Sequence, residues 1–111
     1  MLNQIVLVGR LTKDPEVKET DTGKKVSHIT LAVPRSYKNS DGEYESDFIN
    51  CTLWTGIAEN TAEYCHKGDL LGVKGRIETR SYEKDDERKF VSEVIAEKVT
   101  FLTNKKSENS D

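Results

Sequence analysis

The sequence predicts an all-β domain in which five strands curve into a barrel and one helix lies between the third and fourth strands. Three observations predict it. Short β-rich apolar segments recur along the chain, only one segment has helical spacing, and glycines interrupt strand segments at positions 9, 72 and 75. Glycine inside a strand often marks a bend or a bulge. The glycines therefore favour a curved barrel over the alternative, a flat α+β sheet.

The first half of the chain is predicted to supply three strands. Residues 4–11 form an apolar strand, and residues 16–20 form a short edge strand or turn. Residues 26–33 form the second strand, and Pro34 is expected to end its hydrogen bonding because proline has no N–H donor. The segment 39–42 (NSDG) is a strong turn signal, so residues 44–54 are expected to return as the second arm of a hairpin.

Residues 57–65 show the helical period, with Thr55 expected as the N-cap and Gly68 as the glycine that stops the helix. Residues 70–82 and 89–102 return to strand patterns on either side of a charged turn at residues 83–88. Three strands, a helix and two strands are typical of the OB-fold, a five-stranded Greek-key barrel. We expect one OB-fold domain at residues 1–103 and a short disordered polar tail at residues 104–111.

The composition narrows the function classes. The net charge is −3, so any nucleic-acid site must depend on where the cations lie rather than on a basic protein as a whole. Cys51 and Cys65 lack CxxC spacing and are expected to be reduced, mostly buried thiols. His28 and His66 do not join them at metal-ligand spacing, so we expect no metal and no cofactor. No signal segment or membrane-length apolar run occurs, which predicts a cytoplasmic protein without membrane contacts.

The third predicted strand has large aromatic rings on its polar face. Alternation places Ile49, Cys51 and Leu53 on the core side, and it places Phe48 and Trp54 on the opposite side with small polar groups between them. Flat rings on a solvated sheet face are suited to stacking nucleic-acid bases. A subunit contact or a second small core is the alternative.

Two other segments combine aromatic and basic side chains. The polar face of the fourth strand is predicted to carry Lys74, Arg76, Glu78, Arg80 and Tyr82, and the hairpin carries Arg35, Tyr37 and Lys38. A plain solvated face and an ordinary exposed loop are the alternatives. Together with the third strand, these segments predict a groove where rings stack bases and cations bind phosphates. Because a duplex hides its base faces, such a groove selects unpaired strands.

The sequence does not favour catalysis. It lacks an arrangement of acidic residues that would suggest catalysis: Asp41, Asp47, Asp85 and Asp86 lie in or beside predicted turns, where acidic residues are expected anyway. The chain has no nucleophile elbow, catalytic triad or glycine-rich phosphate loop. We therefore predict a binding protein and not an enzyme. Two other hypotheses stay open: an OB-fold module that mainly docks replication proteins and has little DNA binding of its own, and a small OB-fold nuclease.

Several segments resemble the bacterial single-stranded DNA-binding proteins (SSB). They are residues 3–17 (NQIVLVGRLTKDPEV), 28–33 (HITLAV), 58–68 (AENTAEYCHKG), 75–82 (GRIETRSY) and 92–94 (SEV). They agree in order and spacing over about residues 2–102. The resemblance implies an OB-fold assembled as a homotetramer, around which single-stranded DNA wraps.

The resemblance also implies functional residues. Tyr37, Phe48, Trp54 and Tyr82 lie where the family has its base-stacking residues, and Lys67 and Arg80 lie at basic positions along the DNA backbone path. Some members have Trp at three of the four ring positions, so stacking is expected to persist. Our assignment of Arg35, Lys38, Lys74 and Arg76 to phosphates comes from strand alternation instead.

The end of the chain departs from the family pattern. Typical members continue into a Gly/Gln/Pro-rich linker and an acidic tip that recruits replication and repair enzymes, whereas this chain stops after residues 104–111 (NKKSENSD). We expect a short form without tail-mediated recruitment. Three explanations of the short end stay open: a short paralogue like those that some Gram-positive bacteria use in natural transformation, a phage-borne copy, or a trimmed chain. The sequence leaves replication, repair, recombination and transformation open.

Overall fold

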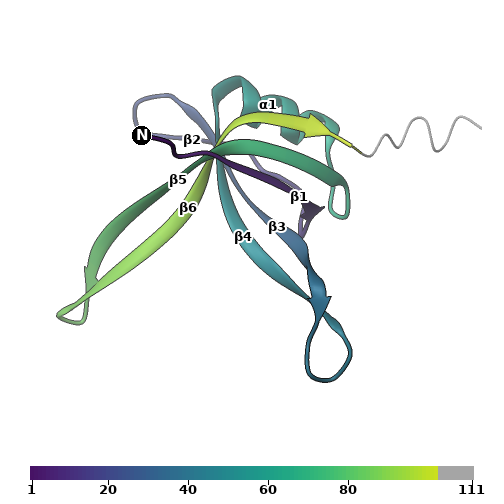
Figure 1. The fold of residues 1–111 in the computed structure, drawn as a ribbon. Helices are drawn as coiled ribbons and strands as arrows, with labels where there is room; N and C mark the ends of the chain where they lie inside the picture. The colour runs from purple at the N-terminus through teal and green to yellow at the C-terminus, as the bar shows by residue number, and fades with distance from the viewer. Residues whose placement is uncertain (103–111) are drawn as a thin grey trace, which may run out of the picture.

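The computed structural model describes residues 1–102, so the predicted tail at residues 104–111 lies outside the described residues. Figure 1 shows a barrel from which two long hairpins extend. The elements in chain order are β1 (Ile5–Leu11), β2 (Lys18–Glu19), β3 (Lys25–Lys38), β4 (Tyr44–Trp54), α1 (Thr55–Tyr64), β5 (Leu70–Lys84) and β6 (Glu87–Phe101).

The strands close on themselves. Strands β1, β5, β6, β4 and β3 are hydrogen-bonded in this order, and β1 also pairs with β3, which completes a five-stranded barrel. Within the described residues the pairings are antiparallel except for β4 with β6, where Cys51 lies opposite Val94. β2 adds two residues to the edge of β3. The predicted OB-fold barrel, with one helix between the third and fourth of its strands, is confirmed.

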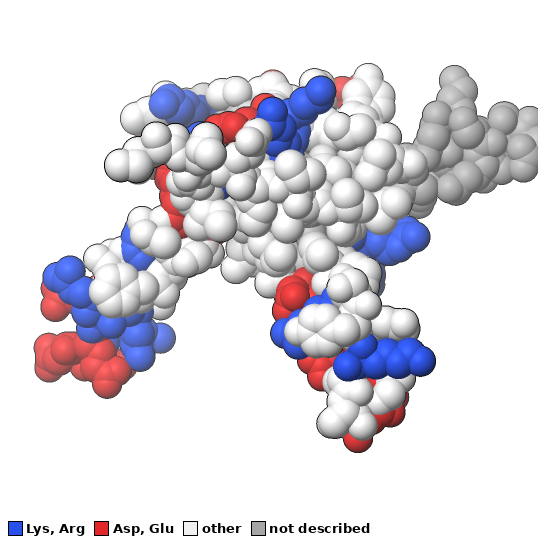
Figure 2. Space-filling model, in the orientation of Figure 1, with Lys and Arg blue, Asp and Glu red and all other residues white. Residues whose placement is uncertain are grey.

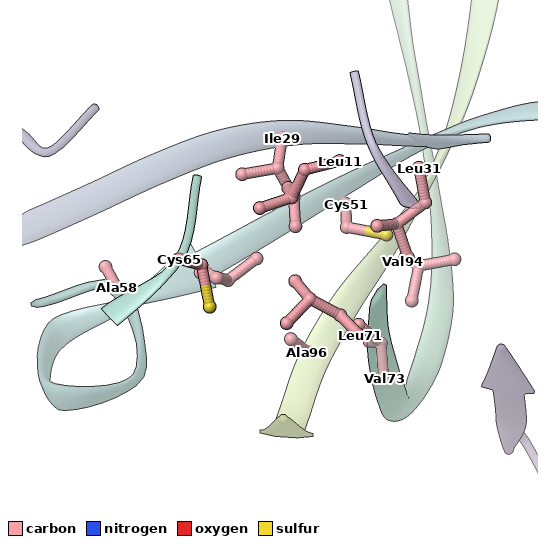
Figure 3. Close-up of a cluster of buried hydrophobic side chains, with 11 residues drawn as sticks. Leu11, Ile29, Leu31, Cys51, Ala58, Cys65, Leu71, Val73, Val94 and Ala96 are labelled. Atoms are coloured by element: carbon pink, nitrogen blue, oxygen red, sulfur yellow. The ribbon is translucent and has the colours of Figure 1, made fainter. Parts of the chain in front are cut away.

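Side chains from all five barrel strands fill the barrel. Leu31, Leu53 and Leu71 are fully buried, and α1 buries Ala58 and Thr61. Figure 3 shows how the core side chains converge. The buried cluster consists of Leu11, Ile29, Leu31, Cys51, Leu53, Ala58, Cys65, Leu71, Val73, Val94 and Ala96.

Both cysteines belong to this core, as predicted. They are buried and not disulfide-bonded. Burial raises the pKa of the Cys51 thiol to about 11, and burial together with the Asp69 carboxylate raises the pKa of Cys65 to about 11. Since the thiolate is the reactive form, neither thiol is activated as a nucleophile at neutral pH.

Two hairpins leave the barrel on the side away from α1 (Figure 1). We call residues 34–48 the β3–β4 arm and residues 77–92 the β5–β6 arm. Neither arm contains a buried residue. The first arm turns at Asn39, whose side-chain oxygen accepts hydrogen bonds from the N–H groups of Asp41 and Glu43, both at 2.9 Å. The second turns at Asp85 and Asp86, which have positive φ angles of 55° and 65°.

Pro34 does not end β3, contrary to the prediction. It lies opposite Ser46, and the strand continues to Lys38, which lies opposite Tyr44. The register shifts between Pro34 and Lys38. Proline is compatible with a strand at such an irregular, exposed position because the missing N–H leaves no buried acceptor unpaired.

The ends of the helix and of the last turn also differ from the predictions. Trp54 occupies the N-cap position without a side-chain cap, and Thr55 is the first helical residue. Cys65 is the C-cap, so Gly68, with a φ of +91°, belongs to the following turn. The charged turn expected at residues 83–88 is shorter, because β5 extends to Lys84 and β6 begins at Glu87. No helix in residues 1–102 is long and apolar enough to cross a membrane.

Two of the three strand glycines permit close backbone approach. A Cβ atom at Gly75 would lie 2.0 Å from the carbonyl oxygen of Ile95, and one at Gly9 would lie 2.7 Å from that of Ala32. Gly75 lies where the β5–β6 register shifts, at the junction of barrel and arm. A Cβ at Gly72 would make only ordinary contacts, the nearest at 3.6 Å.

Candidate nucleic-acid interface

The four aromatic residues predicted to stack bases lie on three parts of the molecule. Tyr37 and Phe48 belong to the β3–β4 arm, Tyr82 to the β5–β6 arm, and Trp54 to the barrel end of β4. Phe48 is 67% exposed, Tyr37 and Tyr82 are exposed as well, and Trp54 is half-buried. The rings on the arms therefore present apolar surface to solvent without a core to cover them.

The two faces of β4 agree with the predicted alternation. Cys51 and Leu53 point into the core, and Phe48 lies opposite Ala32 on the other face. Thr52, expected on the solvated face, is 3% exposed. It is buried because Glu93 of β6 lies over it and accepts its hydroxyl hydrogen bond.

A polar hollow separates β4 from the root of the β5–β6 arm. Its volume is about 220 Å³. It connects the Phe48 face of β4 with the predicted cation Arg80, because Asn50 and Thr52 line it on one side and Arg80 lines it on the other. The complete lining is Lys13, His28, Ile29, Thr30, Asn50, Cys51, Thr52, Arg80, Val91 and Glu93.

A chain of hydrogen bonds crosses this hollow. Arg80 donates to Glu93 and forms an ion pair with it, although the Glu93 side chain is only 10% exposed. The other Glu93 oxygen accepts from Thr52. The Thr52 hydroxyl donates its hydrogen bond to Glu93, so its oxygen can only accept from His28. The Nδ1 atom of His28 lies 3.3 Å from that oxygen. The carboxylate therefore holds Arg80 at the edge of the hollow.

Arg35 is neutralised on the β3–β4 arm. Its guanidinium forms ion pairs with Asp47 at 2.8 Å and with Glu45 at 3.2 Å. The hydrogen bond to Asp47 raises the pKa of Arg35, and the same bond lowers the pKa of Asp47. A phosphate would have to replace a well-placed carboxylate to bind Arg35.

Arg76 is neutralised in the same way at the base of the β5–β6 arm. It pairs with Glu78 at 2.8 Å and with Glu97 at 3.2 Å. The hydrogen bond to Glu78, followed by that to Glu97, raises its pKa. All three arginines predicted to bind phosphates therefore have carboxylate partners. Figure 2 shows this mixture of basic and acidic side chains on both arms.

The predicted lysines differ from the arginines. In residues 1–102, the ammonium groups of Lys38, Lys67 and Lys74 form no ion pair. Lys38 lies 5.7 Å from the ring centroid of Tyr44. Lys74 lies on the barrel wall opposite Val6, and Lys67 lies in the loop after α1, where its backbone N–H donates to Asp14 at 2.7 Å.

The structure thus brings together only part of the predicted site. Arg80 meets the β4 face at the hollow, and Tyr82 follows it two residues further along the β5–β6 arm. Lys74 and Lys67 are separate from the arms. Lys13, which lines the hollow beside Arg80, was missed because a single lysine in a turn has no periodic signal. Tyr44 was also missed, although it has the same strand parity as Phe48.

The described residues offer no site for a metal. No group of three or more His, Cys, Asp or Glu residues in residues 1–102 is arranged to hold an ion. The hollow instead combines two cations, hydroxyls, an amide and the Glu93 carboxylate, and it lies on the same face of β4 as the exposed Phe48 ring. These groups suit a ligand with phosphates, base edges and flat apolar faces.

Residues 2–102 match the model of the Single-strand binding protein family. The chain belongs to this family. It is 55% identical over 111 residues to Single-stranded DNA-binding protein B of Bacillus subtilis (strain 168), and the match covers 99% of this chain and 98% of that relative. It is 56% identical over 103 residues to the Single-stranded DNA-binding protein of Halalkalibacterium halodurans, covering 92% of this chain and 61% of that protein.

A further relative is Single-stranded DNA-binding protein A of Bacillus subtilis (strain 168), 55% identical over 103 residues, or 92% of this chain and 60% of the relative. Against such longer relatives the chain spans about three-fifths of their length. The family match confirms the predicted SSB resemblance. It also confirms the prediction of a binding protein rather than an enzyme, because the family is one of DNA-binding proteins.

Proposed function

We propose that this SSB-family protein coats single-stranded DNA without sequence preference, by stacking bases on exposed rings and contacting phosphates with cations. The observation that carries the proposal is the β4 face, where Phe48 is exposed beside a hollow that contains Lys13 and Arg80. The same strand brings Trp54 to the barrel end of this face. These two rings and two cations support a DNA path along the β4 face.

Base stacking explains why binding would not depend on the DNA sequence. Each base stacked on an aromatic ring contributes about 1–3 kcal/mol, and every base has a π-face. Tyr37, Phe48, Trp54 and Tyr82 are the proposed stacking residues. The proposed phosphate contacts are Lys38, Lys67 and Lys74, which have no carboxylate partner in the described part of the chain, and Arg35, Arg76 and Arg80, which would exchange a carboxylate for a phosphate.

We also propose the homotetramer that the family resemblance implies. Val6 and Val8 support an assembly because both are exposed large apolar side chains on β1, outside the barrel core. A second copy that covers this wall would remove that surface from water. The protein would act in the cytoplasm, bound to DNA during replication, repair, recombination or natural transformation.

Trp54 provides the test because it is the single tryptophan of the chain. Titration with poly-dT is expected to quench its fluorescence, and Phe48→Ala is expected to weaken binding about fivefold or more, since one stacked base is lost. Light scattering of the same sample gives the mass of the assembly. Duplex DNA of equal length is the control. Equal affinity for duplex and poly-dT, or no binding of either, would contradict the proposal.

A further inference from the structure

Tyr44 lies on the same surface as Phe48, closer to the end of the β3–β4 arm. Tyr44, Ser46 and Phe48 alternate along β4, and they lie opposite Lys38, Pro34 and Ala32. Because directly opposed residues of antiparallel strands share a face, the two rings lie on one side of the arm. Phe48 lies four residue steps along the strand from Tyr44, or about 14 Å.

The surface between the two rings is recessed. Ser46 and Pro34 lie there, and both line a hollow of about 330 Å³. Tyr44 is 61% exposed, close to the 67% of Phe48. The side chain of Tyr44 is therefore exposed to about the same degree as the proposed stacking ring of Phe48.

A cation accompanies the ring. The Lys38 ammonium lies 5.7 Å from the ring centroid of Tyr44, within the range of a cation–π contact. Lys38 has no ion pair within the described residues, so its charge is not neutralised. A base stacked on Tyr44 would have its phosphates within reach of this charge.

The carboxylates of the arm lie on the other side. Glu45 and Asp47 alternate with Tyr44 and Phe48 along β4, so they point to the opposite face. Arg35 holds both of them there, and Asn39 donates a further hydrogen bond to Glu45 at 2.9 Å. The face with the two rings therefore carries a lysine and no carboxylate from β4, which favours a polyanion.

We propose that Tyr44 and Lys38 form an additional base-stacking subsite that extends the single-stranded DNA path from Phe48 to the end of the β3–β4 arm. The subsite rests on the proposed function, because it lengthens the same path.

Four variants of the full chain test the subsite with a fluorescent dT oligonucleotide. Tyr44→Ala and Tyr44→Val are expected to weaken binding about five- to tenfold, the effect of one lost stacking contact. Tyr44→Phe is expected to bind like the unmodified chain, because the ring remains. Valine favours strands as tyrosine does, so it removes the ring and keeps the strand preference. The matched control is Tyr64→Ala, which removes a tyrosine of α1 that is 62% exposed. This variant is expected to bind the dT oligonucleotide with unchanged affinity.

The same titrations with oligonucleotides of increasing length show where the ring acts. For the unmodified chain, affinity is expected to keep rising at lengths where the Tyr44→Val variant has reached its plateau. If Tyr44→Val binds like Tyr64→Ala while Phe48→Ala weakens binding, the subsite is wrong and the proposed function stands. If the unmodified chain binds no single strand, the proposed function is wrong and the subsite falls with it.

Discussion

The barrel and the two arms are built from the same strands but are stabilised differently. In the barrel, β3, β4 and β5 bury Leu31, Leu53 and Leu71 completely. In the arms the same strands bury no residue, and the aromatic side chains face water. A two-stranded hairpin without a core is marginally stable by itself. The arms are therefore held by the barrel at their roots, by turns at their ends and by ion pairs along their sides.

We expect this difference to separate stability from binding within one chain. Large rings on a surface that cannot bury them contribute little to folding, so their presence on the arms is better explained by a ligand. The buried leucines have the opposite role. Substitutions in the barrel should therefore change the free energy of unfolding, and substitutions on the arms should change the affinity for DNA.

The largest expected effect is on the barrel. Leu53→Ala should lower the free energy of unfolding by about 2–5 kcal/mol, because it removes fully buried methyl groups and leaves a cavity. Urea unfolding followed by Trp54 fluorescence measures the loss. Phe90→Ala is the control on the β5–β6 arm, where the ring is exposed, and it should change stability by about 0.5 kcal/mol or less. Equal losses would show that the arm packs as the barrel does.

The second effect concerns the junction between the two regions. A methyl group at Gly75 would clash with the backbone carbonyl of Ile95, so Gly75→Ala should cost about 1–3 kcal/mol and displace the root of the β5–β6 arm. Gly56→Ala is the matched control, because nothing lies within 4 Å of a Cβ there and alanine favours a helix. For Gly75→Ala, the unfolding temperature and the affinity for dT should both fall. For Gly56→Ala, the unfolding temperature should stay unchanged or rise slightly, and the affinity for dT should stay unchanged. A Gly75→Ala variant as stable as the control would contradict the role given to this glycine.

The barrel could be predicted from the sequence because its signals are local. Alternation assigned Cys51 and Leu53 to the core, and the glycine at position 75 marked a strand that bends, which agrees with the register shift found there. The faces of β4 followed from the same period of two. Tyr44 could have been found by this rule too, since it shares the parity of Phe48.

The ion pairs between strands could not be predicted because they depend on register across each hairpin. Arg80 reaches Glu93 only because the β5–β6 turn contains two residues, Asp85 and Asp86, both with positive φ. Neither residue is a glycine, so no glycine marked so tight a turn, and a six-residue turn was expected. Pro34 misled the prediction of the other arm in the same way, because only the paired strand shows that β3 continues past it.

The smallest expected effect concerns the carboxylate of Glu93, which forms an ion pair with Arg80 of the β5–β6 arm. Glu93 is nearly buried at the barrel wall, and it occupies the guanidinium of Arg80 that we expect a phosphate to need. Glu93→Gln should therefore raise the affinity for dT by severalfold, about 1 kcal/mol, and make the dependence of binding on salt steeper by about one counterion. The measurement is a series of fluorescence titrations at increasing salt concentration.

Glu97→Gln is the matched control for this change. It removes one carboxylate from Arg76 but leaves Glu78 bound to the same guanidinium at 2.8 Å, so no cation is released and the salt dependence should stay as it is. Weaker binding by Glu93→Gln would mean that the carboxylate positions Arg80 for the phosphate instead of competing with it. The polar chain from His28 through Thr52 and Glu93 would then be a rigid support by which the barrel orients the arm, and the division between a stabilising barrel and binding arms would not hold at this point of contact.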